Sequence, residues 1–88
     1  EVVMRELQFN IKDPNGIHAR PAGVLVTTLK EFKSSVTIFK GDRSADMKKL
    51  LALMGLGIKQ GDSVTVKVDG EDEDECSKVL VKTFEENF

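Results

Sequence analysis

The hydrophobic residues of this 88-residue chain follow two different periods. Within residues 4–12, Leu7, Phe9 and Ile11 alternate with polar residues, which is the pattern of a half-buried strand. From Ala19 to about Lys33 the apolar spacing changes to three and four residues, which predicts a helix with one buried stripe. The stripe consists of Ala22, Leu25, Val26, Leu29 and Phe32.

The remaining sequence predicts three more strands and two more helices. Strands are expected around residues 36–38, 43–46 and 64–68, where apolar and polar residues alternate or a turn pattern separates two short runs. A short helix is expected over residues 47–56, because Gly55 and Gly57 follow its apolar residues and end it. The acidic run 71–75 indicates the solvated start of a last helix and predicts no ligand site. The inward stripe of that helix consists of Cys76, Val79, Leu80, Thr83 and Phe84.

The predicted order of elements is β-α-β-β-α-β-α, which indicates an α+β fold. An antiparallel sheet with the helices packed on one face buries all of these apolar stripes. The opposite face of the sheet is then polar and faces water, as antiparallel sheets permit. The residues expected on that face are Gln8, Asn10, Thr37, Thr65 and Lys67.

Composition narrows the class of protein. Hydrophobic residues make up 40% and charged residues 32%, values that suit a globular domain, and the net charge of -2 supplies no basic field for nucleic acid. No run is apolar enough to cross a bilayer and no signal peptide is visible, so we expect a cytoplasmic protein without membrane insertion. The single cysteine, Cys76, excludes an internal disulfide and a cysteine-based zinc site, and we expect it in the core. We expect no metal and no cofactor.

The segment Gly16-Ile17-His18-Ala19-Arg20-Pro21-Ala22 carries the candidate chemistry. His18, the one histidine, lies between a turn at residues 13–16 and the start of the first predicted helix. A neutral imidazole is a nucleophile near neutral pH, and the backbone N–H groups of Ala19 and Arg20 at the helix start would hold phosphate oxygens. Arg20 adds a guanidinium that binds phosphate through two hydrogen bonds. From spacing alone, a solvated surface histidine beside a surface arginine is the more common arrangement.

The short helix predicted over residues 47–56 has more apolar residues than one core face needs. Its apolar positions are Leu50, Leu51, Leu53, Met54 and Leu56. If they all pack inward, the segment is only core. If one or two reach solvent, they form a patch for a partner, and the flexible methionine adapts such a patch to more than one partner.

These motifs resemble those of the HPr family, the histidine-containing phosphocarrier proteins of the bacterial phosphoenolpyruvate:sugar phosphotransferase system. The first motif is the His18 segment. The second is Met54-Gly55-Leu56-Gly57-Ile58 followed by Gln60-Gly61-Asp62, and the resemblance covers nearly the whole chain. It implies a single HPr-like domain over residues 1–88. The implied fold is an open-faced β-sandwich with a four-stranded antiparallel sheet in the order 1-4-2-3 and three helices on one face.

The same resemblance implies a function. His18 would accept a phosphoryl group on Nδ1 from enzyme I and pass it to enzyme IIA of a sugar permease, with Arg20 assisting the transfer. The protein would be a monomeric carrier, a co-substrate of these partners rather than an enzyme. Residues that match the family's partner surface are Ile17, Leu50, Leu51 and Met54.

The chain departs from the family pattern at Lys49. Many HPr proteins carry there, at the start of the second helix, a serine that a dedicated kinase phosphorylates; lysine accepts no such phosphate and does not cap a helix as serine does. We therefore expect no regulatory serine, and we expect Asp46 to cap the helix instead. Two other functions stay open: an HPr-like regulatory phosphocarrier of a nitrogen-related branch, and a regulatory docking module that transfers no phosphate.

Overall fold

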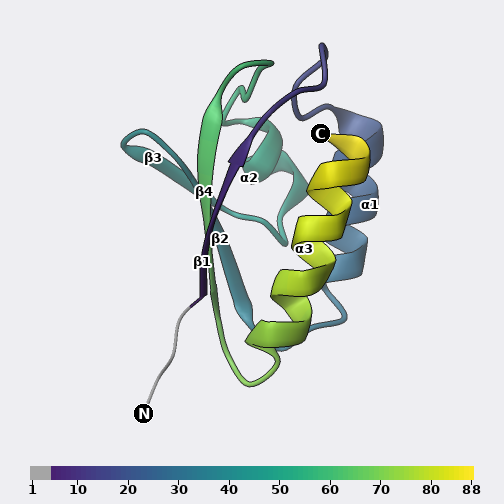
Figure 1. Cartoon of the computed structure of the whole chain (residues 1–88), viewed down its shortest axis with the longest axis vertical. Helices are drawn as coiled ribbons and strands as arrows, with labels where there is room; N and C mark the ends of the chain where they lie inside the picture. Colours follow the sequence, from purple (N-terminus) through teal and green to yellow (C-terminus); the bar gives the residue numbers. More distant parts are fainter. Residues whose placement is uncertain (1–4) are drawn as a thin grey trace.

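The computed structural model describes residues 5–88, and its elements follow the predicted order (Figure 1). Residue 4 of the first predicted strand lies outside the described residues. No helix within residues 5–88 has both the length and the apolar content needed to cross a membrane. The elements are β1 (Arg5–Asn10), α1 (Ala19–Leu29), β2 (Ser35–Lys40), β3 (Arg43–Asp46), α2 (Leu50–Met54), β4 (Ser63–Asp69) and α3 (Glu73–Asn87).

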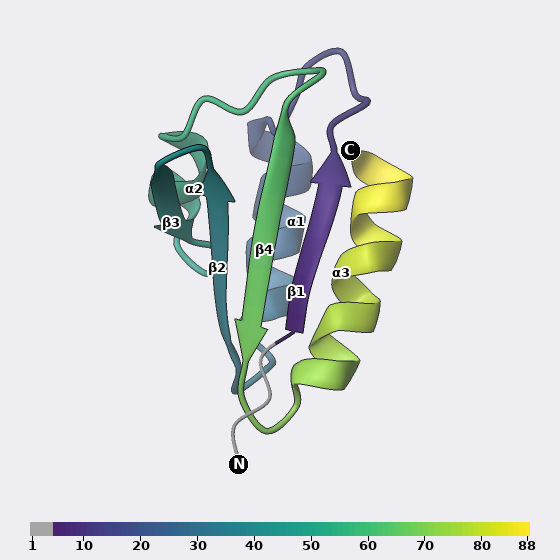
Figure 2. The ribbon, with the colours of Figure 1, turned by 60° about the vertical axis from the view of Figure 1, so that its left-hand side comes forward.

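The four strands form one antiparallel sheet in the order β1-β4-β2-β3, which confirms the predicted topology. In the register of the sheet, Val66 of β4 lies opposite Leu7 on one side and Ile38 on the other. Because side chains alternate along a strand, these three residues share one face of the sheet. Figures 1 and 2 show α1 and α3 lying along that face, with α2 beside β2 and β3.

The core lies between the sheet and the helices. Ala22, Leu25 and Leu29 of α1 are fully buried, as the helical stripe predicts. Phe84 of α3 stacks on Phe9 of β1 with ring centroids 4.1 Å apart, which ties the last helix to the edge strand. The polar face of the sheet stays uncovered, as expected: Gln8 and Asn10 are exposed, and Thr37, Thr65 and Lys67 are partly exposed.

Helix α1 ends at Leu29, four residues before the predicted end near Lys33. The reason lies in another part of the chain. The carboxylate of Asp72 accepts the backbone N–H groups of Lys33 and Ser34 at 2.8 and 2.9 Å, and also the Ser34 hydroxyl at 2.5 Å. These bonds hold the chain in a tight bend that leads into β2, so the helix does not continue.

Helix α2 is also shorter than the predicted 47–56 and covers Leu50–Met54. Met47 is fully buried, and its N–H donates to the carbonyl oxygen of Val36, so it extends the sheet rather than the helix. Asp46 does not cap α2 with its side chain. Its carboxylate accepts the N–H of Lys48 at 2.8 Å and closes a turn ahead of the helix.

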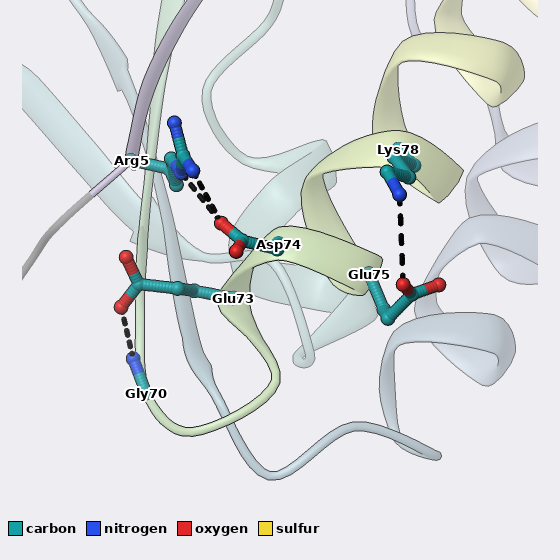
Figure 3. Close-up of polar contacts among 6 residues, drawn as sticks. All are labelled: Arg5, Gly70, Glu73, Asp74, Glu75 and Lys78. Atoms are coloured by element: carbon teal, nitrogen blue, oxygen red, sulfur yellow. Dashed lines mark hydrogen bonds and ion pairs between the residues drawn. The ribbon is translucent and has the colours of Figure 1, made fainter.

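The acidic run at the start of α3 is not fully solvated, which corrects the expectation (Figure 3). Glu73 is 9% exposed, and its carboxylate accepts the N–H of Gly70 at 3.2 Å. Asp74 pairs with Arg5 of β1 at 2.6 Å. These contacts join the helix start to the preceding turn and to the edge strand, so part of the run has a structural role.

Candidate functional site

The turn at residues 13–16 places the His18 segment. One carboxylate oxygen of Asp13, Oδ1, accepts the N–H of Asn15 at 2.8 Å, and the carbonyl oxygen of Asp13 accepts the N–H of Gly16 at 2.9 Å. Ile17 then donates its N–H to the carbonyl oxygen of Ile58 at 3.2 Å. The turn is therefore closed by its own polar groups and fastened to the loop before β4.

Gly16 makes a close backbone contact in this turn. Its φ of +64° lies in the left-handed region, which favours glycine. A Cβ atom at this position would lie 2.3 Å from the carbonyl oxygen of Ile58 and 2.7 Å from the Cα of Lys59. Only a residue without a side chain fits here. Glycine at position 16 therefore allows the turn to lie this close to the loop at Ile58 and Lys59.

His18 occupies the N-cap position of α1 in an extended conformation, with φ of -118° and ψ of 170°. Its carbonyl oxygen accepts the N–H of Ala22 at 3.0 Å, while its imidazole makes no cap hydrogen bond and is 38% exposed. The N–H groups of Ala19 and Arg20 have no acceptor within the helix, and Pro21 has no N–H. The first turn of α1 also lacks an acidic residue, so the positive end of the helix dipole stays open to an anion.

The surface around His18 is a shallow hollow. It is formed by the turn before α1, the first turns of α1 and the end of α3. Its lining comprises Asp13, His18, Arg20, Pro21, Val24, Glu86 and Asn87. Arg20 is exposed and makes no ion pair with any residue in the 5–88 range, so its guanidinium is free for a ligand. Oδ2 of Asp13 lies 3.7 Å from Nε2 of His18.

Sequence reasoning missed Asp13, Glu86 and Asn87 as neighbours of the imidazole. For Asp13 a signal existed, since a Pro-Asn-Gly turn after it reverses the chain and returns His18 to its side. For Glu86 and Asn87 no signal existed, because only the packing of α3 beside α1 brings them to the hollow (Figure 1).

The loop that supports Ile17 is braced from the β2–β3 hairpin. Lys40 pairs with Asp62 at 3.0 Å and donates to the carbonyl oxygen of Gly57 at 3.1 Å. Arg43 donates to the carbonyl oxygen of Gly55 at 2.9 Å. The N–H of Lys59 and the ammonium of Lys40 together hold the pKa of the Asp62 carboxyl below its usual range. The brace keeps the loop in place behind the His18 turn.

Cys76 does not supply a second nucleophile. The thiol is buried in the core, as expected, and its burial raises its pKa to about 11. The Asp72 carboxylate adds to this effect. A neutral, inaccessible thiol is unreactive. Within residues 5–88 no group of three or more histidine, cysteine, aspartate or glutamate side chains is arranged to hold a metal ion.

A comparison with known families agrees with this geometry. A family model described as the PTS HPr component phosphorylation site matches residues 5–86. The chain belongs to the HPr family. It is 41% identical over 83 residues to phosphocarrier protein HPr of Lysinibacillus sphaericus, covering 94% of each chain. HPr proteins are phosphocarriers of the phosphotransferase system and do not catalyse a reaction of their own.

Solved HPr structures have the same fold. A crystal structure of HPr from Thermoanaerobacter tengcongensis superimposes with a TM-score of 0.87 at 36% identity, covering 92% of this chain and 91% of that one. Crh of Bacillus subtilis, described as a domain-swapped intertwined dimer, gives a TM-score of 0.75 at 31% identity, covering 89% and 90%. The family therefore includes a dimeric arrangement besides the single-chain fold of Figure 1.

The four residues that were expected to contact partners differ in how exposed their side chains are in this HPr fold. Leu51 is 87% exposed and Leu50 is 36% exposed, so both reach solvent from α2. Met54 is half-buried and packs against the core. Ile17 is 6% exposed and belongs to the core, so little of its side chain is accessible to a partner. Its backbone N–H donates to the carbonyl oxygen of Ile58, which holds this segment against the loop before β4.

The N-cap residue of α2 has no hydroxyl side chain. Lys49 stands at the N-cap position, is exposed, and makes no side-chain cap hydrogen bond. A lysine offers no hydroxyl for phosphorylation at this helix start.

Proposed function

We propose that this chain carries phosphoryl groups on Nδ1 of His18, accepting them from phosphorylated enzyme I and passing them to enzyme IIA components of sugar permeases. One observation carries the proposal: a partly exposed imidazole stands at the open N-terminal end of α1. Membership of the HPr family supports the same conclusion. We also propose that the protein acts in the cytoplasm, where the partners of this family work, and as one domain over residues 1–88.

The transfer needs little from the protein beyond position and charge. The lone pair of Nδ1 attacks phosphorus, the new N–P bond forms, and the bond from phosphorus to the donor's nitrogen breaks. The N–H groups of Ala19 and Arg20 and the helix dipole stabilise the phosphate oxygens, and the Arg20 guanidinium reaches them from solvent. The product is a phosphorylated carrier, so the protein is a co-substrate of its partners.

Leu50 and Leu51 form the proposed docking surface, with Met54 at its inner edge. The first two are exposed apolar side chains on a helix that contacts α1. Both enzyme I and enzyme IIA would use this surface in turn, so we propose that the active form is a monomer. A dimer that covered Leu51 would block the exchange of partners.

Labelling with phosphoenolpyruvate and enzyme I tests the proposal. We expect the intact protein to gain one acid-labile phosphoryl group by mass spectrometry, and His18→Gln to gain none while keeping its circular dichroism spectrum. Addition of a sugar-specific enzyme IIA should remove the label. No labelling of the wild-type chain contradicts the carrier role, whereas transfer to a nitrogen-branch acceptor but to no sugar enzyme IIA contradicts the sugar branch.

The role of Arg20 is tested by comparing the transfer rates of two variants. Arg20→Ala should slow the transfer about tenfold or more, because a charge-assisted bond to phosphate is worth about 1.5–3 kcal/mol. Lys82→Ala removes a cation from an exposed position of α3 and serves as the matched control. Equal rates for the two variants would exclude Arg20 from the transfer.

A further inference from the structure

We infer that Asp13 selects the nitrogen of His18 that reacts: its carboxylate holds the ring proton on Nε2 and leaves the lone pair of Nδ1 free. The inference rests on the proposed carrier function and assigns a positioning residue to it. Asp13 does not touch the phosphoryl group in this scheme. It acts through the imidazole.

Three hydrogen bonds hold Asp13 in place. Its backbone N–H donates to the carbonyl oxygen of Phe88 at 3.0 Å, its carbonyl oxygen accepts the N–H of Gly16, and Oδ1 accepts the N–H of Asn15. The remaining oxygen, Oδ2, therefore faces the imidazole and lies 3.7 Å from Nε2 of His18. The Asp13 side chain is 27% exposed, so water screens this contact only in part.

The charge of Asp13 decides between the two forms of the neutral ring. A neutral imidazole has one N–H and one lone pair, and a carboxylate only accepts hydrogen bonds. A proton on Nε2 points toward Oδ2 and is attracted, whereas a lone pair on Nε2 would face the carboxylate and be repelled. At 3.7 Å the two atoms are at an ion-pair distance and not a hydrogen-bond distance, so the carboxylate acts on the ring through its charge. With the proton on Nε2, Nδ1 keeps its lone pair. Contacts of this kind tighten when the reacting group binds.

The proton on Nε2 stays in place throughout the transfer. Nδ1 attacks phosphorus, the N–P bond forms, and the donor's P–N bond breaks, which leaves a positive charge on the His18 ring. The Asp13 carboxylate balances that charge. When the phosphoryl group leaves for the acceptor, the P–N bond electrons return to Nδ1 and the ring is again neutral with its proton on Nε2. No proton enters or leaves the solvent in either direction.

Other charged groups share the hollow but are placed differently. Glu86 and Arg20 line it, yet neither forms an ion pair with His18 among the described residues. A phosphoryl group on Nε2 would meet the Asp13 carboxylate directly, and the repulsion disfavours that product. The same carboxylate therefore orients the proton and excludes the wrong nitrogen.

Asp13→Asn is the sharpest test, because the turn keeps its acceptor. The amide oxygen replaces Oδ1 at the N–H of Asn15, so the amide NH₂ takes the place of Oδ2 and presents a donor to Nε2. We expect the neutral ring to change from mostly Nε2–H to mostly Nδ1–H. Nitrogen-15 NMR reads this directly, since the chain has one histidine. We also expect kcat for phosphorylation by enzyme I to fall about tenfold with little change in KM.

The controls separate this role from a structural one. Asp42→Asn removes an equal charge at the exposed β2–β3 turn and should change neither the ring spectrum nor the rate. Asp13→Ser keeps a turn acceptor, offers nothing to the ring, and should give a mixture of both ring forms; it also serves if Asp13→Asn is poorly folded. An unchanged ring form, or a changed ring form with an unchanged kcat, overturns the inference. Failure of the wild-type chain to be phosphorylated contradicts the carrier function, while the ring spectrum still tests Asp13.

Discussion

Replacing Gly16 by alanine tests how the His18 turn is built. The residue has a φ of +64°, and the added Cβ would lie 2.3 Å from the carbonyl oxygen of Ile58. The next nearest atom is the Cα of Lys59 at 2.7 Å, so both atoms that the Cβ would overlap belong to the backbone. No side-chain rotation relieves the overlap, so the turn and the loop must separate.

Two contributions determine how far Gly16→Ala lowers the free energy of unfolding. An alanine in the left-handed region costs about 1–2 kcal/mol relative to its preferred conformation. Separation of the turn from the loop also breaks the hydrogen bond from Ile17 to Ile58, a loss of about 1 kcal/mol. We therefore expect Gly16→Ala to lower the free energy of unfolding by about 2–3 kcal/mol. In a domain of this length each kcal/mol corresponds to about 4–8 °C in Tm.

Two other glycines isolate these contributions. Gly41 has a φ of +62° with no atom within 4 Å of an added Cβ, so Gly41→Ala carries the conformational cost alone, about 1–2 kcal/mol. Gly23 lies inside α1, also with free space, so Gly23→Ala should stabilise the protein by about 0.5–1 kcal/mol. The expected order of stability is Gly23→Ala, wild type, Gly41→Ala, Gly16→Ala.

Urea unfolding measures all four proteins, and the phosphorylation assay follows the site. Gly16→Ala should also slow phosphorylation of His18, since the displaced turn carries the imidazole, whereas Gly41→Ala should leave the rate unchanged. If Gly16→Ala and Gly41→Ala lose equal stability, the contact with Ile58 contributes nothing and the reasoning is wrong.

Two further regions give direct predictions. Leu51→Ser should change the free energy of unfolding by less than about 0.5 kcal/mol, because the side chain is 87% exposed. The same variant should raise the KM of enzyme I for this carrier severalfold. An unchanged KM would remove Leu51 from the docking surface. Leu53→Ala, 1% exposed in the same helix, should lower the unfolding free energy in urea by about 2–5 kcal/mol, and a loss as small as that of Leu51→Ser would refute its place in the core. The Cys76 thiol, with its pKa raised to about 11, should not react with iodoacetamide at pH 8 until the protein unfolds. Because the folded pKa exceeds the unfolded one, its contribution to stability is present below about pH 9 and is lost as the pH rises toward 11; Cys76→Ala should lack this decline.

The order and type of the elements followed from the sequence, whereas their ends did not. The stripe through Ala22, Leu25 and Leu29 predicted α1 because burial on one face leaves a helical period in the sequence. The end of α1 depends on Asp72, which takes the N–H groups of Lys33 and Ser34 from a position 38 or 39 residues away. A local pattern does not contain such a bond.

The candidate site divides in the same way. His18 and Arg20 were found because they stand close together at a helix start, where chemistry and local structure coincide. The burial of Ile17 was not predicted, because its neighbours in the sequence do not reveal that its backbone bonds to the loop at Ile58. The hydrophobic excess in α2 left open whether its apolar side chains are all buried, and the structure decided that Leu51 reaches solvent and Leu53 does not.

The sequence by itself determined the order of strands and helices along the chain, and it placed the candidate nucleophile His18 at a helix start. Each of these depends on residues within one or two turns of each other. The tertiary structure alone decided where the helices end, which leucines are available to a partner, and that Asp13 and Glu86 lie at the imidazole's hollow. These features depend on how segments distant along the chain pack together, because burial and the distance between charges are properties of the closed fold.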